Sequence, residues 1–151
     1  MARLLTYLLA AFFITSTGIA ATTSGKIVKV LPVFLDLEGR ESLNPSLYER
    51  DAYQALLRRD PKKRSALRFN VQWKTKLDRP LLLKVEMRGG KGSEATEAAM
   101  EKSERHLSGF SKWSGLVLSG DQYQNFGELI AWRVTLWDGD KLIGEKKSFL
   151  W

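Results

Sequence analysis

Residues 129–140 read Leu129-Ile130-Ala131-Trp132-Arg133-Val134-Thr135-Leu136-Trp137-Asp138-Gly139-Asp140, and this stretch decides the fold. Apolar residues alternate with smaller or more polar ones, which is the period of a β-strand with one buried face. The Asp-Gly pair that follows indicates a tight turn, because glycine adopts the positive φ that such a turn needs. The sequence therefore predicts a C-terminal β-hairpin whose second arm runs from Lys141 to Trp151. Its first arm places four side chains in the core: Ile130, Trp132, Val134 and Leu136.

The register of this hairpin has two solutions. A two-residue loop, Asp138-Gly139, has the better turn chemistry but sets Trp132 opposite Glu145. A three-residue loop gives two compatible cross-strand pairs, Arg133 with Glu145 and Leu136 with Leu142. We favour the three-residue loop.

Further strands are expected where the same alternation recurs, over residues 26–37, 67–74, 81–88 and 113–118. The strand at 67–74 alternates without a fault, and Trp73 near its end is expected to fill the centre of the core. Pro32 interrupts the first strand, so we expect an edge strand with a break or bulge at that point. The short link from Thr75 to Pro80 is compatible with antiparallel pairing of the strands on either side of it.

One helix is expected between the first two strands, over about residues 45–58. Asn44-Pro45 opens it, because asparagine caps helix N-termini and proline fits the first helical position, and Asp60-Pro61 ends it. Its apolar residues fall near helical spacing: Leu47, Tyr48, Ala52, Ala55 and Leu56. Residues 89–93 are expected to form a flexible loop and residues 121–127 a helical turn. Residues 94–107 are either a loosely held strand or a frayed helix.

These elements predict a mostly β protein, a single antiparallel immunoglobulin-like β-sandwich with one short inserted helix. Tyr123 precedes the penultimate strand, where a tyrosine can bond across the corner of an immunoglobulin-like or fibronectin-III-like sandwich. A small outer-membrane β-barrel is the less favoured alternative, because the helix and the charged residues 89–108 fit it poorly.

Residues 1–20 are expected to be a signal peptide. Arg3 supplies a positive charge, an apolar run extends from Leu4 to Ile14, and small residues follow as far as Ala20. Cleavage after Ala20 would leave one sandwich domain, residues 21–151, without a transmembrane span. The protein would then be periplasmic or secreted. The alternative is an uncleaved N-terminal anchor.

The composition excludes several kinds of chemistry. The chain has no cysteine, which rules out disulfides, thiolate metal sites and cysteine nucleophiles. It has one histidine, His106, which rules out sites with several histidine ligands. The formal charge is +7, and Arg3 is the only charged residue of the expected signal peptide. A positive charge of this size favours anionic neighbours.

Two groupings could in principle carry chemistry. Asp138 and Asp140 offer carboxylates, but their spacing does not match a twelve-residue calcium loop, and a tight turn accounts for them. His106 lies near three serines in the sequence, Ser103, Ser108 and Ser111, but no strained nucleophile turn accompanies them. We therefore expect no catalytic residue, no cofactor and no metal, and so a non-enzymatic protein.

Binding is the remaining class of function. The densest basic run surrounds Asp60-Pro61, where a loop should keep its side chains in water: Arg58, Arg59, Lys62, Lys63 and Arg64. Tryptophans beside such cations could stack on sugars or pack on a partner, and Trp137 and Trp151 are the first candidates. Exposure of these two and of Trp113 would favour a glycan-binding or lipid-head-group-binding module. The expected partner is an envelope protein or an anionic polymer. Nucleic acid is not expected, since export would remove the protein from the cytoplasm.

Two stretches of the chain resemble a family of small exported bacterial proteins with an immunoglobulin-like or fibronectin-III-like sandwich. The first extends from Leu47 to Lys74, and the second begins Ala131-Trp132-Arg133-Val134 and ends at Trp151. The resemblance covers most of the domain and implies an exported sandwich. It transfers no catalytic or binding residue, because no activity is assigned to that family.

Overall fold

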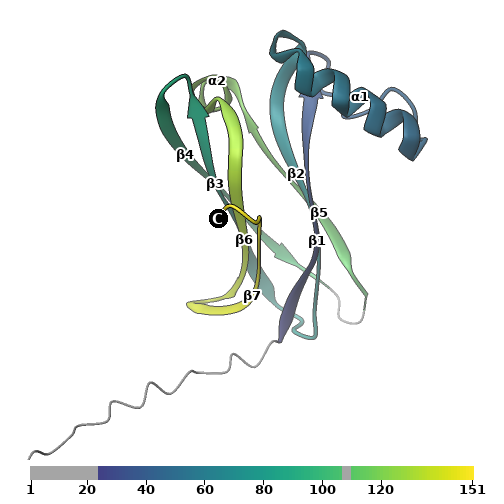
Figure 1. Ribbon diagram of the computed structural model, residues 1–151. Helices are drawn as coiled ribbons and strands as arrows, with labels where there is room; N and C mark the ends of the chain where they lie inside the picture. The colour runs from purple at the N-terminus through teal and green to yellow at the C-terminus, as the bar shows by residue number, and fades with distance from the viewer. Residues whose placement is uncertain (1–23, 107–109) are drawn as a thin grey trace, which may run out of the picture.

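The computed structural model describes residues 24–106 and 110–151, and two antiparallel β-sheets packed face to face make up most of it (Figure 1). The expected signal peptide lies outside the described residues. The three-stranded sheet has the order β1-β2-β5: β1 (Gly25–Asp36), β2 (Arg64–Thr75) and β5 (Lys112–Ser119). The four-stranded sheet has the order β4-β3-β6-β7: β4 (Glu94–Arg105), β3 (Pro80–Lys91), β6 (Glu128–Asp138) and β7 (Lys141–Lys147). Three helical segments join them: α1 (Leu47–Arg59), the 3₁₀ turn η1 (Pro61–Lys63) and α2 (Gly120–Phe126).

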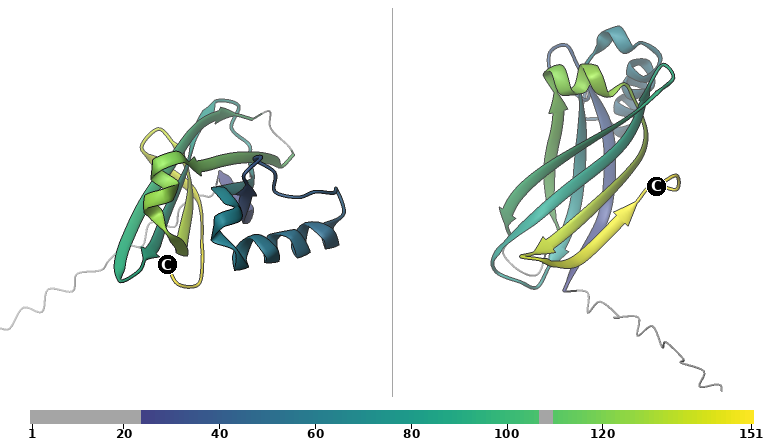
Figure 2. Two further views of the ribbon diagram at one scale, coloured as in Figure 1. Left: turned by 90° about the horizontal axis from the view of Figure 1, so that it is seen from above. Right: turned by 90° about the vertical axis from the view of Figure 1, so that its left-hand side faces the viewer.

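This strand order confirms the immunoglobulin-like β-sandwich. In immunoglobulin lettering, β1, β2 and β5 are strands A, B and E, and β4, β3, β6 and β7 are C′, C, F and G. Strands β2 and β3 therefore lie in different sheets, and the expectation that they pair as neighbours is wrong. The link after Thr75 crosses from one sheet to the other instead of turning within one. Figure 2 shows the outer face of the four-stranded sheet, with β7 at one edge and α2 at its upper end.

The core follows from alternation in β2 and β3, as expected. Every second residue of these strands is at most 1% exposed: Leu67, Phe69, Val71 and Trp73 in β2, and Leu81, Leu83, Val85 and Met87 in β3. Trp73, at 0% exposure, is the largest fully buried side chain. At about 25 cal/mol per Å² of apolar surface, these strands supply much of the stability of the fold.

The C-terminal hairpin is confirmed, but its register is neither of the two expected. The turn residues are Gly139 and Asp140, and Gly139 has φ 56°. A bulge next to Leu136 lets Ile143 of β7 turn into the core, so Thr135 lies opposite Glu145. Neither expected register contained this bulge, because the local sequence gives no sign of it.

The prediction of which β6 side chains face the core is only partly confirmed. Val134 and Leu136 are fully buried, and Trp132 is partly buried with its ring in an edge-on contact with Phe69. Ile130 is 55% exposed, so its placement in the core is wrong. A second bulge, where β6 pairs with β3, inserts Ile130 as an extra residue and shifts the alternation there.

Three other expectations are settled by the strands. Residues 94–107 contain the strand β4, and residues 89–93 are not a loop, since β3 continues to Lys91 and only Gly92 and Ser93 form the turn. The strand β1 is an edge strand, as expected. The break expected at Pro32 is absent, because Pro32 pairs regularly with Phe69, and the bulges of β1 lie after Ile27 and after Leu35.

Helix α1 is present, and it begins at Leu47, two residues later than expected. Its N-cap is Ser46, so the expectation that Asn44 caps the helix and Pro45 is its first residue is wrong. It lies on the side of the three-stranded sheet that faces away from the other sheet (Figure 1). Its buried residues are Gln54 and Leu57, whereas Leu47, Tyr48 and Leu56 are 68%, 83% and 43% exposed. The apolar residues that helical spacing grouped together therefore face solvent.

Polar contacts anchor α1 to the edge strand β1. The amide of Gln54 pairs with the backbone of Phe34, accepting from its N–H at 2.8 Å and donating to its carbonyl at 2.9 Å, as a neighbouring strand would. The hydroxyl of Tyr53 donates to Asp36 Oδ2 at 2.6 Å, and the Nε of Arg40 donates to the same oxygen at 2.9 Å. These contacts cover the free edge of β1, and the opposite side of the helix is exposed among the described residues.

A second polar chain joins the two sheets between β5 and β4. The indole N–H of Trp73 donates to Ser114 Oγ at 2.8 Å, and the Ser114 hydroxyl donates to Glu104 Oε2. Lys112 and Lys102 also contact this carboxylate, at 3.0 and 2.5 Å. Burial raises the pKa of Glu104, but hydrogen bonds from Lys102, Ser114 and Lys112 outweigh it and lower the pKa to about 2.

Glu104→Gln should therefore destabilise the protein in a pH-dependent way. A lowered pKa contributes stability that is present in full above about pH 4.5 and is lost as the pH falls towards 2. We expect the variant to lose about 1–2 kcal/mol in urea unfolding at pH 7 and about a quarter of that at pH 2.5, where the carboxylate of the folded protein is partly protonated. Glu97→Gln, at a side chain that is 80% exposed, is the matched control. An equal loss at both pH values would contradict this role of the Glu104 charge.

Candidate binding face on the three-stranded sheet

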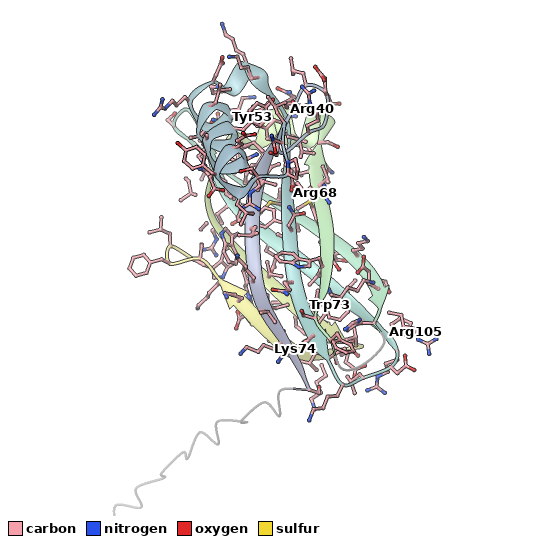
Figure 3. All side chains as sticks on the ribbon, turned by 90° about the vertical axis from the view of Figure 1, so that its right-hand side faces the viewer. Arg40, Tyr53, Arg68, Trp73, Lys74 and Arg105 are labelled. Carbon is pink, nitrogen blue, oxygen red and sulfur yellow. The ribbon has the colours of Figure 1, made fainter. Side chains whose placement is uncertain are left out.

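The register of the three-stranded sheet brings cations and an aromatic ring together on its outer face. Alternation points Lys74, Gln72 and Asn70 of β2 away from the core. Across the sheet, Lys26 pairs with Lys74, and Gln72 lies between Lys29 on one side and Trp113 on the other. We call Lys26, Lys29, Gln72, Lys74 and Trp113 the lysine–tryptophan face. Figure 3 looks onto this side of the molecule, with Arg68 near the α1 end of β2 and Lys74 near the other end.

The three lysines of this face form no ion pair with any described residue, although Glu145 lines the same depression as Lys26 and Lys74. The lysines that form ion pairs in residues 24–106 and 110–151 are Lys63, Lys84, Lys102 and Lys112. Lys26, Lys29 and Lys74 are all exposed, and Lys26 and Lys74 are directly opposite each other. Like charges that face each other across strands are destabilising, so folding gives no reason for this arrangement.

The outer face of the four-stranded sheet is different, because most of its charges are paired; an exception is Lys147, which lies opposite Arg133 and forms no ion pair among the described residues. Lys84 pairs with Glu86 and Glu101 at 3.7 and 3.5 Å, and Arg133 pairs with Glu145 at 2.7 Å. Arg88 lies 3.8 Å from Glu97. A polyanion has to displace these carboxylates there, but it meets unpaired lysines on the three-stranded sheet.

Trp113 gives the lysine–tryptophan face an apolar surface. It is 48% exposed on β5, and next to it in the same strand Gly115 carries no side chain. The guanidinium of Arg68 fills that space, since a Cβ on Gly115 would lie 2.9 Å from Arg68 Nη2. The Nε of Arg68 is buried and has no hydrogen-bond partner within the described residues. The face thus combines an exposed aromatic ring with the amide of Gln72, and the Arg68 guanidinium packs beside it over Gly115.

Two depressions border the face. One of about 250 Å³ lies towards α1 and is lined by Leu31, Glu41, Arg50, Asn70 and Trp113. The other, of about 450 Å³, lies where β1 meets β7 and is lined by Gly25, Lys26, Ile27, Lys74, Gly144 and Glu145. Glu41 is the acidic residue of the first depression, and Asn70 Nδ2 already donates to it at 2.9 Å. The two depressions place polar groups at both ends of the row of cations.

The basic run predicted from the sequence is only partly a surface cluster. Arg58, Arg59, Lys62 and Lys63 are exposed, and Lys63 contacts Asp60 at 3.6 Å. Arg64 is 5% exposed, so the expectation that its side chain lies in water is wrong.

Arg64 instead ties α1 to the end of the sandwich. Its guanidinium donates to the carbonyls of Leu57 and Arg58, pairs with Glu128 at 2.7 Å and lies 4.1 Å from the centre of the Phe34 ring. These partners leave it no free donor face for a ligand.

Trp137 and Trp151, the other predicted binding residues, are both engaged within the protein. The indole N–H of Trp137 donates to Thr135 Oγ1 at 2.8 Å. The Trp151 ring lies under the guanidinium of Arg88, at 4.3 Å from Cζ to the ring centre. Both are partly buried, so Trp113 is the most exposed of these three tryptophans.

Asp138 of the final turn and His106, which were considered for metal binding and catalysis, contact other side chains of the protein. Asp138 is paired with Arg79, and His106 lies edge-on to Trp73 with ring centres 5.4 Å apart. Ser108 lies outside the described residues. Within the described part of the chain no group of three His, Asp or Glu side chains could hold a metal ion, and no helix is long and apolar enough to cross a membrane.

The lysine–tryptophan face was not found from the sequence. The alternation in residues 67–74 does point Gln72 and Lys74 outward, but the partners Lys26, Lys29 and Trp113 come from strands whose register cannot be read locally. The chain matches no protein-family model, no curated protein and no solved structure. The function is therefore argued from this geometry.

Proposed function

We propose that this protein is an exported, non-enzymatic sandwich that binds an acidic polysaccharide of the cell envelope through the lysine–tryptophan face. The observation that carries the proposal is the unpaired, directly opposed pair Lys26 and Lys74 on the same face as exposed Trp113. Repulsion between the two ammonium groups is relieved when an anionic group lies between them.

The dimensions of the sheet suit an extended polymer. Neighbouring strands are about 4.8 Å apart, and residues two apart on one strand are separated by about 7 Å. Lys29 and Lys74 are thus close enough to contact successive acidic groups of one chain. The ring of Trp113 offers a flat apolar surface on which a sugar ring can stack. The amide nitrogens of Asn70 and Gln72 already donate to Glu41 and Ser111, and their amide oxygens can accept from sugar hydroxyls.

A triple variant tests the proposal: Lys26→Ser, Lys29→Ser and Lys74→Ser. Its affinity for heparin and for polygalacturonate, measured by titration calorimetry, should fall by about tenfold or more at low salt. The parent protein should bind more weakly as salt rises, because the screening length shortens to about 8 Å at physiological ionic strength. Trp113→Ala should also weaken binding, but it should change the salt dependence of binding less than the triple lysine variant does.

The matched control removes the same charge elsewhere, through Arg59→Ser, Lys62→Ser and Lys63→Ser. These residues belong to the basic run that the sequence indicated, and we expect the control to keep most of the affinity. If the control loses binding and the first variant does not, the polyanion site is the basic run. If both variants bind as the parent does, the protein does not recognise acidic polysaccharides by charge.

A further inference from the structure

The inserted segment between β1 and β2 carries more exposed large apolar side chains than any other segment among the described residues. Five large apolar side chains on residues 37–56 are 43–83% exposed: Leu37, Leu43, Leu47, Tyr48 and Leu56. Three of them belong to α1, and two of these, Tyr48 and Leu56, lie away from the side that holds Gln54 and Leu57 against the sandwich. Such a concentration on one segment marks an interaction surface.

The attachment of α1 leaves this apolar side free. Gln54, Tyr53 and Arg64 hold the helix through hydrogen bonds to β1 and to its own C-terminal carbonyls. Leu57 is its one fully buried apolar side chain. The helix is therefore fixed in orientation by contacts on one side, while Tyr48, Ala52 and Leu56 form a row on the other at i, i+4 and i+8 spacing.

Cations stand at the C-terminal end of the same segment. Arg58, Arg59, Lys62 and Lys63 are exposed within six residues, and only Lys63 forms an ion pair among the described residues, with Asp60. An apolar row beside a basic cluster is the pattern of a helix that lies in the interface of a bilayer with anionic lipids.

We propose that α1 docks on an anionic lipid surface, with Tyr48 and Leu56 in the interface and the four cations against phosphate groups. A soluble polyanion would use the cations and leave the apolar row in water. A bilayer surface accounts for both features at once. This site is separate from the lysine–tryptophan face and does not depend on the proposed polysaccharide binding.

Vesicle co-sedimentation tests the proposal. The probe is vesicles of phosphatidylglycerol and phosphatidylcholine, with pure phosphatidylcholine vesicles as the neutral reference. The test uses a version of the protein that begins at Ala21, so that the apolar N-terminal run is removed and every described residue of the sandwich is kept. We expect binding to the anionic vesicles and at least about tenfold weaker binding to the neutral ones.

Two variants separate the apolar and charged contributions. Tyr48→Ser with Leu56→Ser should weaken vesicle binding by about tenfold or more, and changing the four cations to serine should do the same. The control is Val117→Ser with Ile130→Ser, two exposed apolar residues elsewhere, at 46% and 55% exposure. Circular dichroism of each variant should match the parent, since all these side chains face solvent.

The outcomes are distinct. Loss of binding in both α1 variants, but not in the control, supports docking through α1. If the apolar variant binds like the parent, attraction is electrostatic only and the proposed seating of the helix is overturned. Equal binding to both kinds of vesicle, or to neither, overturns it as well. The variant of Lys26, Lys29 and Lys74 should keep its vesicle binding, so this proposal and the polysaccharide proposal can fail separately.

Discussion

Trp73→Ala is expected to lower the free energy of unfolding by about 3–5 kcal/mol. The side chain is fully buried at the centre of the core, so its removal leaves a cavity that neighbouring side chains on both sheets cannot fill. The change also leaves Ser114 without the indole N–H that it accepts at 2.8 Å. Loss of this donor adds to the cost because Ser114 is only 3% exposed.

Urea unfolding followed by far-ultraviolet circular dichroism measures this effect. Trp137→Ala is the matched control, because that ring is partly exposed and lies outside the core. We expect the control to cost about 1–2 kcal/mol. A loss below about 1 kcal/mol for Trp73→Ala would show that Trp73 is not the centre of the packing.

Asp36→Ala is expected to cost about 3 kcal/mol and to loosen α1 from the sandwich. The carboxylate is buried and accepts four hydrogen bonds, from Tyr53, from the backbone and side chain of Arg40, and from the backbone of Glu38. Without it, these donors lose their shared partner, and the Gln54 contacts alone hold the helix to β1.

The pH dependence of this effect has a defined sign. Burial raises the pKa of Asp36, but the hydrogen bonds from Tyr53, Arg40 and Glu38 outweigh it and hold the pKa well below its usual value. The contribution is therefore complete above about pH 4 and is lost as the pH falls below it. Hydrogen exchange of α1 amides reports the loosening directly. Unchanged protection of α1 in Asp36→Ala would contradict the anchoring role.

Parts of this structure were predictable because they depend on local patterns. Alternation in residues 67–74 and 81–88 identified the two central strands, and the Asp138-Gly139 pair identified the final hairpin. The end of the helix was predictable from Asp60-Pro61, whereas its expected cap at Asn44 was wrong. Two sheets, antiparallel strands and a tryptophan core followed from these elements together.

The failures share a physical cause, since each depends on contacts distant in sequence. Ile130 faces solvent because of a bulge against β3, and Arg64 is buried because Glu128 and the end of α1 surround it. The helix turned its apolar row outward because Gln54 matches the free edge of β1 better than an apolar side chain could. No local pattern contains that edge.

The candidate site was missed for the same reason. Two of its cations lie on one strand and the third on its neighbour, and the tryptophan lies on the strand beyond. The sequence search instead found cations that are consecutive in the chain, around Asp60. Charges that are adjacent in sequence can be separated by folding, as Arg64 is from the exposed residues of that run.

Binding of an acidic polysaccharide to the lysine–tryptophan face can be followed residue by residue in an NMR titration with a heparin or galacturonate oligosaccharide. We expect shifts in the backbone amides of the β1, β2 and β5 segments that carry Lys29, Gln72 and Trp113, and in the Trp113 indole N–H. The amides of β3 and β4, which are remote from Lys26 and Lys74, should stay unchanged. Shifts confined to α1 and η1, or the absence of any shift at ligand concentrations in the millimolar range, would contradict binding at this face.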